Sequence, residues 1–156
     1  MTEWEKFKAE QAAAWLEHVR ELALDVAKTQ DRVDVLRSMA LPSGIDYSAP
    51  MVSTSPTADQ IPNAVAKLVD AMGEYCADLA AYVDESHDAA ERLKMLEDGR
   101  HRLIIMLYYV NGKTWGQVGK AANYAPDYCR HIRDEALPLV YNVMPKEWKT
   151  QIPRAD

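Results

Sequence analysis

The sequence has 156 residues, of which 48% are hydrophobic and 27% charged, a composition that can bury a core and argues against a disordered chain. No apolar run reaches the roughly 18 residues of a membrane helix, and the start, MTEWEKFKAEQ, is charged at once, unlike a signal peptide. We therefore expect a cytoplasmic protein of one domain, or of one small module on an extension.

The net charge of −6 is distributed unevenly along the chain. Residues 1–99 hold 9 Lys and Arg against 19 Asp and Glu, a net charge of −10, whereas residues 100–150 hold 8 against 4, a net charge of +4. Contacts with phosphates need only a local cluster of cations, so this asymmetry fits a DNA-contacting head on an acidic body.

The first 40 residues have the pattern of one long helix. Thr2 and Glu5 have the spacing of a capping box, and neither Pro nor Gly follows before Pro42. Apolar or small side chains then recur at steps of four and three, at Trp15, Val19, Leu22, Val26, Thr29, Val33 and Leu36. This spacing predicts a helix over about 3–39.

Residues 41–60 are rich in Pro, Ser and Thr and predict a linker. Helical spacing returns after Pro62, with apolar side chains at Val65, Leu68, Met72, Tyr75, Leu79 and Tyr82. We expect this second helix either to run on or to restart near Ser86, and to end at Gly99. The two apolar stripes favour an antiparallel helical hairpin over 1–97, but pairing between two chains, a homo-oligomer through the N-terminal helices, satisfies them equally.

The Cys and His residues predict neither a disulfide framework nor a metal site. Cys76 and Cys129 stand at positions that a helical pattern buries, and we expect two buried thiols. The four histidines lack the spacing of metal ligands, so we expect no metal and no cofactor.

The segment RHRLIIMLYYV at 100–110, followed by Asn111 and Gly112, reads either as a strand entering a hairpin or as a buried helix. We prefer the helix, because no second alternating run follows for a strand to pair with. Downstream, Thr114 can cap a short helix, Asn123 can take the left-handed conformation, and Pro126 can start another helix.

The last helix has a buried and an exposed side. Cys129, Ile132, Ala136 and Leu137 lie on one side, and Asp127, Arg130, His131 and Asp134 lie on the other. A short helix, a tight turn and a longer helix with a basic edge predict a helix-turn-helix. The predicted fold is all-α: a helical hairpin, a helix-turn-helix domain at 98–145 and a tail at 146–156.

The segment LIIMLYYVNGKTWGQVGKAANYAPDYCRHIRDEAL resembles region 4 of sigma-70-type transcription factors and the related C-terminal domain of phage and prophage regulators. The residues that match are Tyr108, Tyr109, Gly112, Thr114, Trp115, Gly119, Ala136 and Leu137. The sequence departs from the pattern in having Gln117-Val118-Gly119 for Glu-Ile-Ala, Asn123 for Gly, Ala125 for a capping hydroxyl, and Pro138 inside the last helix. The sigma-like match covers roughly residues 95–141, under a third of the chain.

The resemblance implies binding of promoter DNA through residues 114–140, with the helix at 126–140 in contact with the DNA, and RNA polymerase as a further partner. The candidate DNA-binding residues are Lys113, Lys120, Asp127, Tyr128, Arg130, His131, Arg133 and Asp134. Arg130 is the leading candidate, because a guanidinium suits both a base edge and a phosphate. The two acids must pair with a neighbouring Arg or accept from cytosine to be tolerated there.

We therefore expect a transcription regulator of phage or prophage origin that binds double-stranded DNA. Two other functions stay open: a DNA-packaging component resembling a small terminase subunit, and an interaction module that has lost DNA binding. We do not expect an enzyme, because the sequence has no Gly-rich phosphate loop, no nucleophile elbow and no carboxylate pair that stands apart from helix-surface acids.

Overall fold

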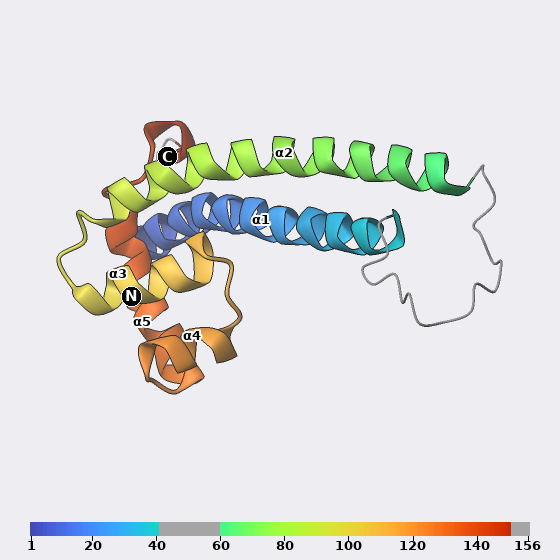
Figure 1. The fold of residues 1–156 in the computed structure, drawn as a ribbon. Helices are drawn as coiled ribbons and strands as arrows, with labels where there is room; N and C mark the ends of the chain where they lie inside the picture. The colour runs from blue at the N-terminus through green and yellow to red at the C-terminus, as the bar shows by residue number, and fades with distance from the viewer. Residues whose placement is uncertain (41–59, 151–156) are drawn as a thin grey trace. The chain divides into compact units, whose positions relative to one another are not determined.

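The computed structural model describes residues 1–40 and 60–150, which form helices and turns with no strand (Figure 1). Helix α1 spans Glu3–Ala40, α2 Gln60–Leu93, α3 Gly99–Ile105, α4 Trp115–Ala122 and α5 Pro126–Val140. A π-helical turn, Met106–Val110, continues α3, and a short 3-10 helix, Lys146–Trp148, follows α5. The all-α prediction is confirmed. The predicted linker, apart from Gln60, and residues 151–156 of the predicted tail lie outside the described residues.

Helix α1 begins and ends within a residue of its prediction. The capping box at its start is formed: the Glu5 N–H donates to Thr2 Oγ1 over 3.2 Å, and the Thr2 N–H donates to Glu5 Oε2 over 2.9 Å. None of the described helices has both the length and the apolar content needed to cross a membrane.

Contacts divide the chain into two compact units, Met1–Leu24 with Tyr82–Asp156, and Asp25–Ala81. In the Asp25–Ala81 unit, Val33 on α1 is buried with Leu68 and Ala71 on α2, and Arg32 pairs with Glu74 over 3.2 Å. Within this unit, α1 and α2 therefore pack on each other. The N-terminal half of α1 packs with the π-helical turn and α5, which follow α2 in the chain.

The predicted stripe on α2 is only partly correct. Val65 and Met72 are 41% and 43% exposed, and Ala71 is buried in their place. At 3.6 residues per turn, these two residues lie roughly 70–90° around the helix from the line of buried residues, beside the contact with α1. Cys76 is also exposed, contrary to the prediction, whereas Cys129 is buried as expected.

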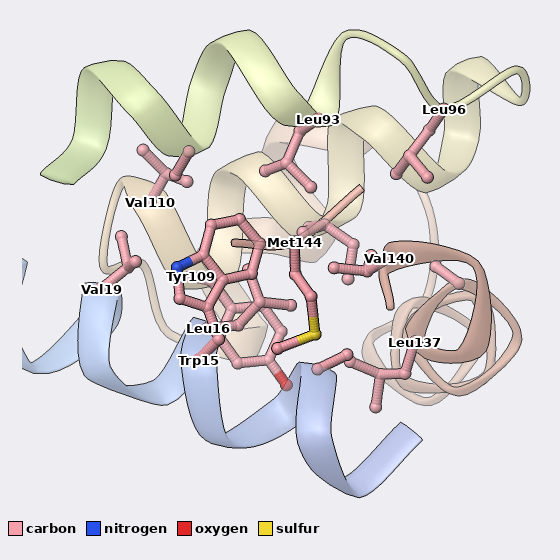
Figure 2. Packing of buried hydrophobic residues seen from close by; sticks show 14 residues of the cluster. Trp15, Leu16, Val19, Leu93, Leu96, Tyr109, Val110, Leu137, Val140 and Met144 are labelled. Atoms are coloured by element: carbon pink, nitrogen blue, oxygen red, sulfur yellow. The ribbon is translucent and has the colours of Figure 1, made fainter. Parts of the chain in front are cut away.

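The largest core lies in the unit that contains the C-terminal helices. Trp15, Leu16 and Val19 of α1 are fully buried against Leu93 of α2, the π-helical turn and α5 (Figure 2). Full burial of a large apolar side chain stabilises a fold by about 1.5–3 kcal/mol. Helix α1 thus shares this core with the π-helical turn and α5.

Gly99 does not end the second helix as predicted; it is the first residue of α3. Helix α2 stops earlier, at Leu93, and the Asp98 side chain caps α3 by accepting from the Arg100 N–H over 2.8 Å. The Arg102 guanidinium donates to the carbonyl oxygens of Leu96 and Glu97 between the two helices. The break between α2 and α3 is therefore stabilised by the Asp98 cap and by the Arg102 hydrogen bonds, and not by Gly99.

Because the phenol of Tyr109 is buried, we expect the protein to lose stability at alkaline pH, where a phenol ionises. Burial raises the pKa of Tyr109 to about 12, and this effect outweighs the nearby charge of Arg133, which lowers the pKa. In an unfolded chain the pKa of a tyrosine is about 10. The neutral phenol is favoured in the fold, so its contribution is complete below about pH 10 and falls by about 2–3 kcal/mol as pH rises towards 12. Urea unfolding across this range should show a smaller alkaline loss for Tyr109→Phe than for the wild type. Parallel profiles would contradict the prediction.

Candidate nucleic-acid interface

Helices α3, α4 and α5 enclose a second small core. Its buried residues are Ile104 of α3, Val118 of α4, and Cys129 and Ile132 of α5. Burial also raises the pKa of the Cys129 thiol, which favours its neutral form. Helix α4, the turn at 123–125 and helix α5 therefore form the predicted helix-turn-helix, with α3 as its third helix.

The chain between α3 and α4 is held by side chains from the two long helices. Arg20 of α1 donates to the carbonyl oxygens of Tyr108 and Lys113, the latter over 2.8 Å, and its guanidinium lies 3.9 Å from the centre of the Tyr108 ring. Tyr82 of α2 donates its hydroxyl to the Val110 carbonyl over 2.8 Å. Carbonyls at the end of a helix need such donors when the chain turns away. These contacts fix the position from which α4 begins.

Helix α4 has the predicted cap, in a complete form. Thr114 Oγ1 accepts from the Gln117 N–H over 3.3 Å, and Gln117 Oε1 accepts from the Thr114 N–H over 3.0 Å. At the other end, Asn123 takes the left-handed conformation with φ 62° and ψ 43°. Both outcomes follow from local chemistry, because Thr caps helices and Asn tolerates positive φ.

Gly119 lies where α4 meets the start of α5. A Cβ atom at this position would stand 2.8 Å from the Tyr124 carbonyl oxygen and 3.4 Å from the Pro126 ring. The absence of a side chain therefore allows the tight turn between the two helices. Pro126 is the first residue of α5, and Ala125 before it supplies no side-chain cap.

The exposed side of α5 carries most of the predicted DNA-binding residues. Asp127, Tyr128, Arg130, His131 and Asp134 are all exposed, and Cys129, Ile132, Ala136 and Leu137 are buried on the opposite side. Lys120 on α4 is exposed and Lys113 half-buried, before the cap of α4. Pro138 lies within α5, which continues to Val140.

Acidic neighbours pair with the cations of α5. Arg130 pairs with Asp127 over 2.5 Å, and Arg133 with Asp134 over 2.9 Å. His131 Nε2 lies 3.0 Å from a carboxylate oxygen of Glu135. The helix thus holds two arginines against three carboxylates. Lys113 and Lys120 have no ion-pair partner in the part of the chain that the structure describes.

The Trp115 ring packs against the side chains of Arg130 and Arg133. Its ring stacks on Tyr108 with the ring centres 4.0 Å apart, and the guanidinium groups of Arg130 and Arg133 lie 5.6 and 5.0 Å from its centre. The Arg133 side chain is only 25% exposed, against 44% for Arg130. The structure therefore leaves Arg130 more available to a ligand than Arg133.

Arg100 of α3 contacts α5 directly. It donates to the Tyr128 hydroxyl over 2.9 Å and pairs with Asp98 over 3.1 Å. The hydrogen bonds between the two residues, and then their opposite charges, lower the pKa of Asp98 and raise that of Arg100. Tyr128 is thereby held at the edge of the exposed side.

Sequence reasoning missed Arg20, Tyr82 and Arg100 as residues that position this surface. Arg20 is separated by 88 and 93 residues from its two partners, and no local motif marks such a contact. No cluster of three or more His, Cys, Asp or Glu side chains suited to a metal ion is found within 1–40 and 60–150. No family model matches the chain, and neither the curated proteins nor the solved structures contain a match.

The close contact at Gly119 can be tested by substitution. Gly119→Ala should destabilise the protein by about 1–3 kcal/mol, because the new methyl group meets backbone that cannot move without opening the turn. Gly116→Ala is the matched control, since the nearest atom to its Cβ is Thr114 Oγ1 at 4.0 Å. That variant should be neutral or more stable by up to about 1 kcal/mol. Urea unfolding measures both, and equal effects would contradict the assigned role.

Proposed function

We propose that the protein binds double-stranded DNA through α5 and acts as a sigma-factor-like transcription regulator of phage or prophage origin. The observation that carries the proposal is the helix-turn-helix itself, with Arg130, His131 and Tyr128 on the exposed side of its second helix. In such motifs the second helix enters the major groove with its first turns against the bases. Lys113 and Lys120 then contact the phosphate backbone.

The ion pair of Arg130 with Asp127 is compatible with this function. Their side chains are 44% and 95% exposed, and exposed pairs contribute about 0–1 kcal/mol. A bidentate contact between an arginine and guanine contributes about 1–3 kcal/mol. DNA can therefore replace Asp127 as the partner of Arg130 at a net gain.

The sigma-like assignment rests on the resemblance and agrees with the local geometry. Tyr108 and Tyr109 lie in the last turn of the helix before the motif, Gly119 lies at the helix crossing, and Ala136 and Leu137 are buried. Contact with RNA polymerase and a cytoplasmic location belong to the same proposal.

A second candidate is an interaction module that no longer binds DNA. It is favoured by the charge of α5, where three carboxylates outnumber two arginines. Each phosphate brought to this surface is attracted by Arg130 but repelled by Asp127 and Asp134. A protein partner would not meet this repulsion.

The test is a fluorescence-anisotropy titration of the full chain with labelled DNA from upstream of neighbouring genes, at low and moderate salt. Arg130→Ala should weaken binding by about 1–3 kcal/mol, roughly 5- to 150-fold in Kd, on the preferred fragment. Lys120→Ala should weaken binding to all fragments similarly and reduce the salt slope by about 1.

Lys94→Ala is the control, because it removes one exposed positive charge outside the motif, near the end of α2. It should bind as the wild type does. If no fragment binds at low salt, the interaction module becomes the better account. A ring-shaped oligomer that binds DNA would instead favour the packaging role.

A further inference from the structure

Helix α2 carries a second apolar face that does not pack on α1. It consists of Val65, Ala66, Val69, Met72, Gly73, Cys76, Ala77 and Ala80, which we call the uncharged face of α2. All eight residues are exposed, with Val69 at 61%. The face lies wholly within the Asp25–Ala81 unit.

The charged residues of this part of α2 lie elsewhere around the helix. Between Val65 and Ala80 they are Lys67, Asp70, Glu74 and Asp78. At 3.6 residues per turn these four fall in one sector, the uncharged face in a second and the buried line of Leu68, Ala71 and Tyr75 in a third. The uncharged face thus runs for about 24 Å without a charge.

The absence of charge limits what can cover this face. Nucleic acids and anionic membranes need cations, whereas the adjoining sector is mainly acidic. A partner whose contacting surface is charged would find no opposite charge on the face itself. In a two-fold dimer, each patch lies against its own copy, so a charged patch repels itself and an uncharged one does not. The uncharged face of a second copy of this chain can therefore lie against this one without electrostatic repulsion.

The sizes of the side chains also fit a second copy. If two α2 helices lie antiparallel about an axis between Met72 and Gly73, Met72 faces the partner's Gly73. The same register sets Val69 against the partner's Cys76, and Val65 against the partner's Ala80. Each larger side chain then lies opposite a smaller one, as close helix packing requires. A Cβ at Gly73 meets nothing within 4 Å, so that space is free.

We propose that two copies of the chain associate through the uncharged face of α2, with the two helices antiparallel and centred on Met72 and Gly73. The inference goes beyond DNA binding and does not depend on it. A dimer would nevertheless present two helix-turn-helix motifs, which is how such motifs commonly read paired half-sites.

The first test is sedimentation equilibrium of the full chain over a series of loading concentrations. We expect the wild type to reach twice the monomer mass and Met72→Glu to weaken the association at least ten-fold. Ala81→Glu is the matched control: it adds the same charge at an exposed position in the charged sector, and should dimerise as the wild type does.

Met72 is 43% exposed, so glutamate is tolerated in the monomer, and circular dichroism should show unchanged helicity. A monomeric wild type would overturn the proposal and leave another occupant for the face, such as residues 41–59 of the same chain or a different protein. A dimer unaffected by Met72→Glu would place the interface elsewhere.

The second test determines the register by disulfide formation. Val69→Cys should give a covalent dimer on mild oxidation, because the new thiol faces the partner's Cys76. The same substitution combined with Cys76→Ser should not. The wild type should not cross-link, since the antiparallel register separates its two Cys76 residues. A wild-type dimer linked through Cys76 would show another arrangement, either parallel or antiparallel about Cys76, and would overturn the proposed register.

Discussion

The helix-turn-helix depends on the docking of the first turns of α1 onto the π-helical turn and α5. Helix α4 has only 8 residues and α5 has 15, lengths at which isolated helices are marginal in water. Trp15 is fully buried although its Nε1–H has no hydrogen-bond partner among the described residues. An unpaired buried donor costs about 1–3 kcal/mol, and burial of the ring with Leu16 and Val19 outweighs it.

This docking gives the long helices a direct role in placing the candidate interface. Arg20 and Tyr82 bind carbonyl oxygens immediately before α4, and Arg92 of α2 donates to the Val143 carbonyl just after α5, over 3.1 Å. Charged or hydroxyl donors thus come from α1 and α2 to both ends of the motif. The acidic N-terminal part of the chain therefore contributes to the geometry of the basic part.

The charges on α5 set the character of the proposed interaction with DNA. Its arginines lie against the Trp115 ring, which restricts their side chains before any ligand binds, and they pair with Asp127 and Asp134. Held side chains lose less conformational entropy on binding, whereas the paired acids lower the attraction for phosphate. Such a surface suits selective contacts of modest affinity. Association of two copies through α2 would compensate for the modest affinity of each motif by linking two of them.

The features that depend on neighbouring residues could be predicted from the sequence. The extent of α1, the Thr114 cap, the left-handed Asn123, the start of α5 at Pro126 and the small residue at Gly119 were all predicted, because each follows from helix periodicity or from local hydrogen bonding and sterics. The buried and exposed sides of α5 were predicted for the same reason.

Which faces are covered and which charges are available depends on how the helices pack together, and the sequence did not predict it. Val65, Met72 and Cys76 have the spacing of buried residues but are exposed, because the side of α2 that is covered depends on where α1 lies. The pairing of Arg133 and the contact of Arg100 with Tyr128 likewise depend on the packing of separate helices. Helical periodicity specifies that a face is apolar. The surface that covers that face comes from elsewhere in the chain, and local sequence does not encode the contact.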